Sequence, residues 1–453
     1  MKRFEHFKEV GIGALSGAAI LALIIGGFSV GGTANNNAQP QASESATASA
    51  SSSPSPSSAR MCSVAEQAAD PLLANLSAVV INPATDEILF DRNAQTPAAT
   101  ASVMKLLTAA AALETLGPNY RAETRVYQDA TDPSTIILVG GGDPTLSRTA
   151  AGVQSVYVDA PKLSTLALNV NQRLAGTPIS KIILDSSMFQ GASWESSWER
   201  SEQTQGYMSE VTALQVDGDR ANPSKETSAR STNPVGNAGR FFKTALGESA
   251  SAATVVKGAL PASAKEIAKV VSQPISKWIN HMLQVSDNTQ AEALARLVSL
   301  DMGFDGSFAS IGPAFKKALA NTGLDLSAVT IRDGSGLSDF NAVSPKVIAD
   351  LMKLVINNTS NLGVINQGLP VSGESGSLAN RFKGDNVDAA GKIFAKTGWI
   401  KKGYTLGGYL KAADGTTLTF AVYALGNVSE STKQAIDNLV TGFYRCGDAL
   451  SNQ

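Results

Sequence analysis

Apolar residues recur with the period of a helix in some stretches of this chain and with that of a strand in others. This spacing predicts the helices and strands. Residues 64–73 have the apolar spacing of a helix, whereas 76–82 and 87–90 are β-rich runs on either side of a Pro/Asp turn, a pattern typical of a hairpin. An apolar run from 106 to 113 predicts a buried helix that begins near residue 101. Helix, hairpin and helix in this order favour an α+β domain with an antiparallel sheet.

The pattern changes after Gly117-Pro118 to short strands and polar loops. Strands are predicted at 123–127, 135–139 and 181–185, with one helix at 161–174. Sequence rich in Ser and Gly then continues to about residue 264. We therefore interpret residues 127–263 as an inserted β-rich domain that divides the main domain into 62–126 and 264–453.

Helical spacing returns in the last part of the chain and gives way to strands. Helices are predicted at 274–285, 289–300, 308–320 and 345–356, and a short strand at 328–331. Strands that end near residue 398 and at residues 412 and 425 come next, followed by a helix at 429–444. This order predicts a meander of three strands closed by a helix.

The first 61 residues do not have the composition of a globular domain. Residues 1–10 carry basic side chains and 11–32 carry no charge, and about 20 apolar residues suffice to span a bilayer. We expect 1–10 to be a cytoplasmic tail and 11–32 an uncleaved signal anchor; a signal peptide cut near Ala34 is the alternative. Residues 33–61, rich in Ser, Ala, Asn and Pro, predict a disordered linker that places the remaining chain outside the cytoplasmic membrane.

The composition indicates how large a core the chain can bury, which partners it can bind and in which compartment it folds. The chain has 453 residues, of which 43% are hydrophobic and 17% charged, with a net charge of -2, so it can bury one large or two moderate cores. Without a basic excess, no nucleic-acid partner is expected. Cys62 and Cys446 are the only cysteines and lie near the two ends of the exported part, where an oxidising compartment favours a disulfide between them. A lipid-modified Cys62 or two ordinary thiols are the alternatives.

Candidate chemistry begins with Ser102 and Lys105 at the start of the buried helix. Residues three apart share one face of a helix, so the Ser102 hydroxyl is expected beside the Lys105 amine, as a nucleophile next to a base. The spacing alone is weak evidence, because Ser-x-x-Lys arises by chance in most chains of this length.

Two polar triplets follow at the ends of predicted elements: Ser286-Asp287-Asn288 just past a helix, and Lys396-Thr397-Gly398 at the end of a strand. The first supplies a hydroxyl and a carboxamide that can face a cleft. The second supplies a cation, a hydroxyl and a residue small enough for a substrate backbone to approach. Each triplet by itself is common.

The three motifs in this order resemble those of the penicillin-recognising serine acyltransferases and β-lactamases. The interval between the first two motifs is long enough for the inserted domain, and the interval between the last two suits a bare catalytic domain. Together with 140–145, 333–338 and 369–373, the chain looks like the class C low-molecular-mass penicillin-binding proteins, the D-alanyl-D-alanine carboxypeptidase/endopeptidase family. The resemblance implies a serine β-lactamase/transpeptidase-like α+β fold over about 62–447.

The resemblance also implies a mechanism and roles for the motif residues. A serine nucleophile would attack a peptidoglycan stem peptide between two D-alanines, β-lactams would acylate the same serine, and no cofactor or metal would be needed. The roles would be nucleophile for Ser102, base for Lys105, proton relay to the leaving amine for Ser286, and support of Lys105 or the substrate amide for Asn288. Substrate binding would fall to Lys396, Thr397, Gly398 and Trp399, with the backbone N–H groups of Ser102 and Trp399 as the oxyanion hole.

Trp399 departs from the family pattern, in which Thr or Ser commonly follows the Lys-Thr-Gly triplet. Indole has no hydrogen-bond acceptor and a much larger volume than a hydroxyl side chain. The substrate range and the efficiency as a carboxypeptidase are therefore left open, as is the choice between carboxypeptidase and endopeptidase.

Other classes of function fit the sequence less well. A Ser-His-Asp triad would have to use His281, because His6 falls in the cytoplasmic tail, and a zinc peptidase needs more ligands and an HExxH motif that the chain lacks. We expect His281 to pack on the helix before Ser286. A β-lactamase shares the three motifs, but no Glu-x-x-Leu-Asn follows Asn288 to activate the deacylating water. A non-catalytic wall-binding or penicillin-sensing module is the remaining alternative.

Overall fold

The computed structural model describes residues 60–452. The predicted cytoplasmic tail and signal anchor and nearly all of the predicted linker lie outside these residues. No helix within the described part is long and apolar enough to cross a membrane.

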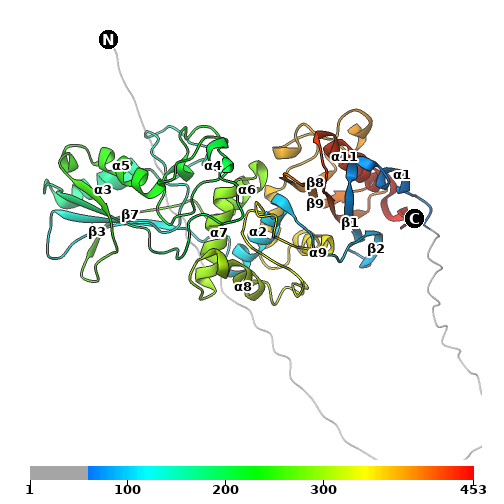
Figure 1. The fold of residues 1–453 in the computed structure, drawn as a ribbon, viewed down its shortest axis with the longest axis horizontal. Helices are drawn as coiled ribbons and strands as arrows, with labels where there is room; N and C mark the ends of the chain where they lie inside the picture. The colour runs from blue at the N-terminus through cyan, green and yellow to red at the C-terminus, as the bar shows by residue number, and fades with distance from the viewer. Residues whose placement is uncertain (1–59, 453) are drawn as a thin grey trace, which may run out of the picture. The chain divides into compact units, whose positions relative to one another are not determined.

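The first of two sheets is built from both ends of the described chain, and all its strands are antiparallel (Figure 1). Its order is β2-β1-β10-β9-β8, with β1 (Asn75–Asn82), β2 (Glu87–Arg92), β8 (Ile393–Ile400), β9 (Gly403–Lys411) and β10 (Thr417–Leu425). The predicted hairpin and three-stranded meander are therefore confirmed. They join through β1 and β10, whose register runs from Asn75 opposite Leu425 to Ile81 opposite Thr419.

Helices cover both faces of this sheet. Alternate residues of β10 show the two layers, because Phe420 and Val422 pack in one core and Ala421 and Tyr423 in the other. The first core is closed by α11 (Glu430–Cys446), and the second by helices that include α9 (Pro345–Ile356). In Figure 1, α11 lies beside α1 (Ala65–Ala68), at the other end of the described chain.

The second core contains the helices that carry most of the candidate site. They are α2 (Met104–Thr115), α6 (Ile275–Val285), α7 (Asn288–Asp301), α8 (Phe308–Ala318) and α10 (Gly363–Gly368). Ten consecutive residues of α2, from Met104 to Leu113, are buried. A helix that is surrounded in this way can be apolar all round, which explains its unbroken apolar sequence.

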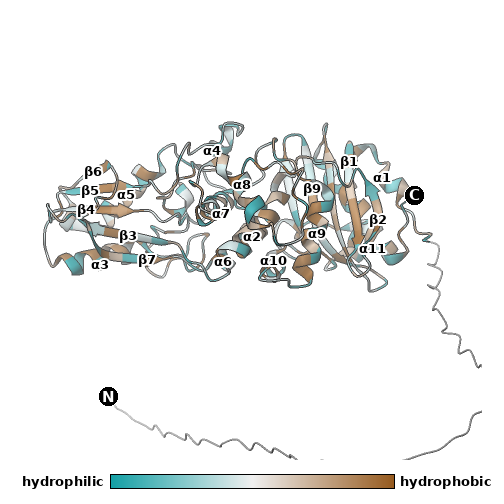
Figure 2. Cartoon of the chain, turned by 90° about the horizontal axis from the view of Figure 1, so that it is seen from below, coloured by the Kyte–Doolittle hydropathy of each residue, from teal (hydrophilic) through white to brown (hydrophobic). Residues whose placement is uncertain are grey.

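The second sheet has the order β6-β5-β4-β3-β7 and extends beyond both ends of the predicted insertion, 127–263, because β3 begins at Glu123 and β7 runs from Lys265 to Val271. Its strands are β3 (Glu123–Gln128), β4 (Thr135–Val139), β5 (Lys181–Asp185), β6 (Thr254–Lys257) and β7 (Lys265–Val271). Strands β4, β5 and β6 are parallel, and β3 is antiparallel to both of its neighbours. Helices α3 (Leu163–Leu174), α4 (Ser201–Gln205) and α5 (Pro234–Leu246) belong to this region, and Figure 2 shows brown, apolar residues along β4 and β5.

The sequence pattern did not predict α5, β6 or β7. Helix α5 contains Gly236 and Gly239, which lower helix propensity. A Cβ on Gly239 would lie 2.5 Å from a methyl group of Leu184, so the glycine allows α5 to pack closely on β5. A packing requirement of this kind overrides propensity and is not visible in the local sequence.

Two further predictions were wrong in detail. The helix predicted at 64–73 ends after α1 because Pro71 cannot continue it; a short 3₁₀ turn, Pro71–Leu73, follows, capped by the Asp70 carboxylate. The strand predicted at 328–331 is reduced to an isolated bridge between Thr330 and Ala342. The other 3₁₀ turns are Ala101–Val103, Asp217–Asp219, Gly247–Ala250, Gly376–Leu378, Gly384–Ala389 and Gly447–Ala449.

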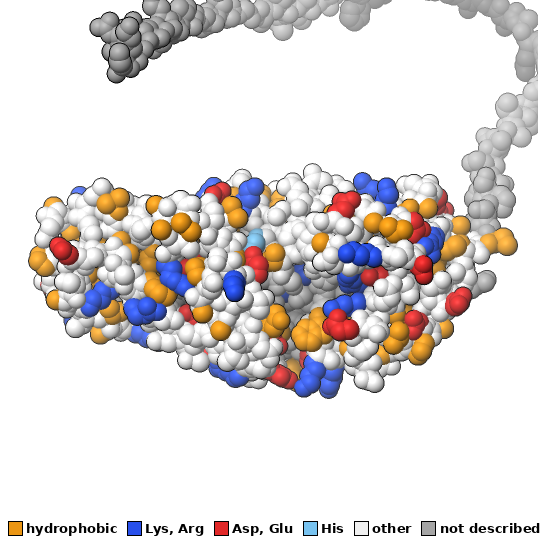
Figure 3. All heavy atoms as spheres, turned by 90° about the horizontal axis from the view of Figure 1, so that it is seen from above, with side chains coloured by type: hydrophobic (Ala, Val, Ile, Leu, Met, Phe, Trp, Pro, Cys, Tyr) orange, Lys and Arg blue, Asp and Glu red, His pale blue; other side chains and the backbone are white. Residues whose placement is uncertain are grey.

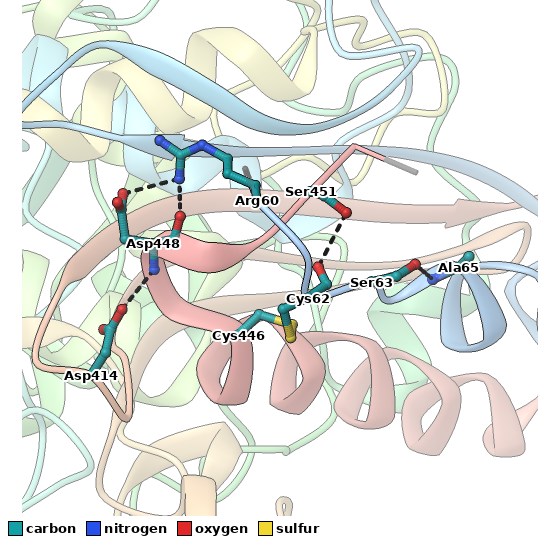
Figure 4. The surroundings of a disulfide bond; sticks show 8 residues. All are labelled: Arg60, Cys62, Ser63, Ala65, Asp414, Cys446, Asp448 and Ser451. Carbon is teal, nitrogen blue, oxygen red and sulfur yellow. Dashed lines mark hydrogen bonds and ion pairs between the residues drawn. A yellow bond between two sulfur atoms is a disulfide. The ribbon is translucent and has the colours of Figure 1, made fainter. Parts of the chain in front are cut away.

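The predicted disulfide is confirmed and joins the two ends of the described chain (Figure 4). Cys62 and Cys446 have Cα atoms 5.4 Å apart and a sequence separation of 384 residues. A backbone hydrogen bond also links the two chain ends, since the Ser451 N–H donates to the Cys62 carbonyl at 2.9 Å. Arg60 adds an ion pair to Asp448 at 3.2 Å.

Candidate active site

Ser102 lies in the 3₁₀ turn that leads into α2, and the backbone before it is held in an unusual conformation. Ala101 has a φ of 45°, a left-handed value that costs free energy for a residue with a Cβ. The Ala101 carbonyl lies against Gly336, where a Cβ would be only 1.8 Å away. The loop that contains Gly336 therefore has to approach Ser102 closely, and only glycine permits this approach.

Lys105 points its amine at Ser102, as the spacing of three residues predicts. Its Nζ donates hydrogen bonds to Ser102 Oγ at 2.8 Å, Asn288 Oδ1 at 2.7 Å and the Ser335 carbonyl at 2.8 Å. The side chain is fully buried. Burial lowers the pKa of Lys105 to about 8, although the Glu292 carboxylate acts to raise it. About a tenth of Lys105 is therefore neutral at pH 7 and able to accept a proton, far more than for a lysine in water.

The second triplet follows the end of α6 and begins α7. Ser286 ends α6 in the left-handed conformation, with a φ of 63°, and Asp287 caps α7 by accepting from the Gln290 N–H at 2.9 Å. Asn288 accepts from Lys105 and donates to the Tyr207 carbonyl at 3.1 Å. The tight change of direction between two helices thus turns Ser286 and Asn288 toward the first motif.

Asp287 holds this triplet to the second-sheet region of the chain. Burial acts to raise the pKa of Asp287, but the Arg220 cation, His281, the Gln290 N–H and Arg230 together outweigh it, so the carboxyl titrates below its usual range. Arg220 Nη2 lies 2.7 Å from Asp287 Oδ2, and both side chains are 2% exposed. The phenol of Tyr157 donates to the same oxygen at 3.1 Å.

The third triplet lies in β8, at the edge of the first sheet. Lys396 Nζ donates to Ser286 Oγ at 2.9 Å and to the Thr397 carbonyl at 2.7 Å. Burial, assisted by the Lys105 charge, lowers the pKa of Lys396 well below its usual value. Thr397 Oγ1 donates to Ser377 Oγ at 2.7 Å. All three predicted motifs are thereby linked by hydrogen bonds around Ser102.

Gly398 and Trp399 bring the edge strand beside the serine. A Cβ on Gly398 would lie 2.9 Å from the Ser102 nitrogen, so the glycine is needed for this contact. Ala395 donates its N–H away from β9, to the Pro370 carbonyl at 3.0 Å. Because every second residue of a strand points its N–H the same way, the Trp399 N–H also faces the open edge, next to Ser102.

The Trp399 side chain is 54% exposed, so it stands at the rim and is not part of the core. Figure 3 shows a hollow in the displayed face, with basic, acidic and apolar side chains around it. The neighbouring Lys401 forms an ion pair with Glu199 at 3.6 Å, which brings the β8–β9 turn near the loop before α4.

Several supporting residues were not identified from the sequence. Glu292 accepts the Gly334 and Ser335 N–H groups at 3.1 and 2.7 Å, and so positions the carbonyl that accepts from Lys105. Burial and the Asp333 charge raise the pKa of Glu292 to about 8. The position of Glu292, one helical turn after Asn288, is the only sequence signal for it; Tyr207 and Ser377 carry none.

A metal centre has weak support in the described part of the chain. One group of side chains there, Glu226, His281 and Asp287, has ligand atoms within 4.8 Å of one another. Arg220 already neutralises Asp287 at 2.7 Å, and His281 bonds to Gln290 at 2.6 Å and Glu226 at 3.0 Å. His281 therefore has structural partners and lies apart from the contacts made by Ser102.

Comparison with known proteins places these features in a family context. The model of the "D-Ala-D-Ala carboxypeptidase 3 (S13) family" matches residues 61–228 and 219–445. The chain is 31% identical to "Carboxypeptidase DacB" of Mycolicibacterium smegmatis over 388 residues, which cover 85% of this chain and 84% of that one. It is also 31% identical to "Carboxypeptidase Rv3627c" of Mycobacterium tuberculosis over 389 residues, with coverages of 85% and 83%.

Solved structures support the fold. The crystal structure of penicillin binding protein 4 (dacB) from Haemophilus influenzae superimposes with a TM-score of 0.70 at 19% identity, covering 82% of this chain and 95% of that chain. The same protein in complex with a β-lactam gives a TM-score of 0.66 at 19% identity, covering 82% and 96%.

Proposed function

The chain belongs to the D-Ala-D-Ala carboxypeptidase 3 (S13) family, and from that membership we propose that it hydrolyses peptidoglycan stem peptides through an acyl-enzyme on Ser102. It is a serine-type D-alanyl-D-alanine carboxypeptidase, endopeptidase or both, and β-lactams acylate the same serine. The observation that carries the assignment is the 2.8 Å hydrogen bond between Lys105 Nζ and Ser102 Oγ in a fully buried site.

Acylation begins when neutral Lys105 accepts the Ser102 hydroxyl proton, as Oγ forms a bond to the carbonyl carbon between two D-alanines. The carbonyl π electrons move to its oxygen, which the Ser102 and Trp399 N–H groups receive. The close approach of Gly398 in β8 to the Ser102 nitrogen supports the pairing of these two N–H groups.

Collapse of the tetrahedral intermediate breaks the C–N bond and requires a proton on the leaving amine. Ser286 is suited to deliver it, because its hydroxyl accepts from Lys396 at 2.9 Å and can donate its own proton at the same time. Ser286 then regains a proton from Lys105, which returns to its neutral form while Asn288 holds it in position. Water then attacks the ester and gives its proton to Lys105, which restores Ser102.

Lys396, Thr397 and Gly398 form the binding side of the site. The Lys396 cation and the Thr397 hydroxyl suit the terminal carboxylate of a stem peptide, and Gly398 leaves room for the substrate backbone to lie along the open edge of β8. Trp399 takes a place beside this carboxylate where relatives commonly have a hydroxyl side chain.

We also propose that the catalytic part works outside the cytoplasmic membrane. The uncharged segment 11–32 follows a basic tail and would anchor the chain, and residues 33–61 would separate the anchor from the domain. The Cys62–Cys446 disulfide supports this location, because such bonds persist in oxidising compartments. Protease treatment of intact cells that leaves the catalytic part uncut would contradict the proposal.

Mass spectrometry of the purified protein tests the function. Benzylpenicillin should add one penicilloyl group to the peptide that contains Ser102, and a peptide ending in D-Ala-D-Ala should lose its last residue. Ser102→Ala should abolish both reactions, whereas Ser377→Ala, which removes a nearby hydroxyl, should retain the adduct. An adduct on another serine, or turnover by Ser102→Ala, would show that the nucleophile is misassigned.

A further inference from the structure

A second, strongly basic cavity lies in the second-sheet region, among the segment after β4, the turn Asp217–Asp219 and α5. We call it the arginine cavity. Its volume is about 400 Å³, within the range of about 300–1,000 Å³ typical of small-ligand pockets. Its charged and amide side chains are Arg148, Asp219, Arg220, Arg230, Asn237 and Arg240.

The wall of the arginine cavity carries four arginines and one carboxylate. Arg148 pairs with Asp217 at 3.2 Å, and Arg220 pairs with Asp287 at 2.7 Å. Arg230 and Arg240 have no ion-pair partner within residues 60–452. The one acidic side chain in the wall, Asp219, accepts from Ser231 and Asn237. The cavity therefore presents two cations that form no ion pair within the described residues, with the Asp219 carboxylate in the same wall.

Arg230 is the more unusual of the two. It is 7% exposed, and the one hydrogen bond of its guanidinium within the described chain is from Nη1 to the Ser228 carbonyl at 2.6 Å. Its Nε is buried without a partner. Burial and the Arg220 cation lower the pKa of Arg230 to about 10. An unpaired buried cation is costly to keep, and an anion in the cavity would offset this cost.

Aromatic contacts preorganise the mouth of the arginine cavity. Arg148 and Arg240 both lie over the Phe241 ring, with guanidinium carbons 4.4 and 4.2 Å from its centre. Stacking fixes the plane of a guanidinium while leaving its N–H edge free to bind. Figure 3 shows blue basic side chains spread over the half of the displayed face that contains α5, with few acidic ones between them.

We propose that the arginine cavity binds a phosphoryl group, with Arg230 and Arg240 as its principal ligands. Planar guanidinium groups bind phosphate oxygens through paired hydrogen bonds, and two unpaired cations match the two charges of a phosphate dianion. The volume leaves room for a substituent on the phosphorus, so both free phosphate and the phosphate of a larger molecule fit. The cavity meets the serine centre through the Arg220–Asp287 ion pair, and it requires no reaction there.

Calorimetric titration of the purified full-length protein with inorganic phosphate, at fixed ionic strength, tests the proposal. We expect saturable binding of one phosphate per chain. Arg240→Gln should weaken it at least tenfold and Arg240→Lys should weaken it less, because the charge remains. Arg173→Gln removes an exposed arginine of α3 outside the cavity and should leave binding unchanged.

Arg240 is exposed, so its variants test the cavity without disturbing a buried side chain, and Arg230→Gln serves as the second variant. Absence of saturable phosphate binding, equal loss in Arg173→Gln and Arg240→Gln, or acetate binding as tightly as phosphate would overturn the proposal. Titration with glycerol 3-phosphate and with the diester glycerophosphoglycerol assigns the source. Tighter binding of glycerol 3-phosphate indicates the phosphate of a larger molecule, and tighter binding of inorganic phosphate indicates the free ion. Tighter binding of the singly charged diester would contradict the match between two cations and a dianion.

Discussion

The pH dependence of acylation gives the most direct test of Lys105 as the base. Neutral Lys105 must accept the Ser102 proton, so the rate should follow the fraction of Lys105 that is deprotonated. Burial lowers its pKa to about 8, whereas a solvent-exposed lysine titrates near 10.4. Raising the pH therefore converts the inactive ammonium into the active amine, and acylation should rise with pH.

The size of the rise follows from this pKa. A group with a pKa of 8 is about 9% deprotonated at pH 7 and about 91% at pH 9, so the second-order rate constant for benzylpenicillin should increase about tenfold between these values. An unperturbed lysine would increase its neutral fraction about a hundredfold over the same range, from a far smaller starting value. Stopped-flow or quenched mass measurement of the penicilloyl adduct between pH 6 and 9.5 distinguishes the two profiles.

Lys396 is the competing candidate, because its pKa is lowered too. Lys396→Arg places a permanent cation in the same position. The acylation rate of this variant should still rise with pH. The rise should begin at lower pH, because an added positive charge disfavours the ammonium form of Lys105. Lys105→Arg should show no acylation at any pH. A flat profile in the wild type, or a rise that disappears in Lys396→Arg, would refute Lys105 as the titrating base.

Three further predictions concern geometry, stability and substrate choice. Gly336→Ala should slow benzylpenicillin acylation about a hundredfold, because the new Cβ would collide with the carbonyl before Ser102; an unchanged rate constant would mean that the loop shifts freely. Loss of the Cys62–Cys446 bond should cost about 4–5 kcal/mol or less, measured as a drop in melting temperature with reductant that Cys62→Ala/Cys446→Ala no longer shows. Trp399→Thr should raise D-alanine release from a pentapeptide more than penicillin acylation, because it adds a hydroxyl partner for the carboxylate, and equal changes in the two assays would contradict this reasoning.

The sequence predicted elements with strong local patterns. The hairpin, the meander and α2 have clear apolar periods, and the disulfide follows from the positions of two cysteines in an exported chain. The three motifs were recognised because their order is specific even though each is common. Their hydrogen-bond network around Lys105 agrees with that interpretation.

The rest of the site depends on contacts that local sequence does not encode. Ser335 acts through its carbonyl, and any residue type supplies a carbonyl. Arg220 reaches Asp287 from a segment that was interpreted only as Ser- and Gly-rich sequence. Helix α5 was missed for the same reason, since Gly239 is explained by β5 packed against it. The arginine cavity is lined by residues of α5 and by Arg220. Because neither was predicted to lie there, the cavity could not be predicted from the sequence.

The two buried lysines of the site differ in what surrounds them. Lys105 has the carboxylates of Glu292, Asp333 and Asp287 near enough to favour its cation, and its pKa remains at about 8. Within residues 60–452, no carboxylate offsets the effect of burial on Lys396, and the Lys105 charge disfavours its cation further. A substrate carboxylate would supply the missing opposite charge, so Lys396 is best stabilised as a cation when substrate is bound. A positive Lys396 beside Ser286 would in turn favour the neutral form of Lys105, so that carboxylate binding itself would prepare the base for acylation.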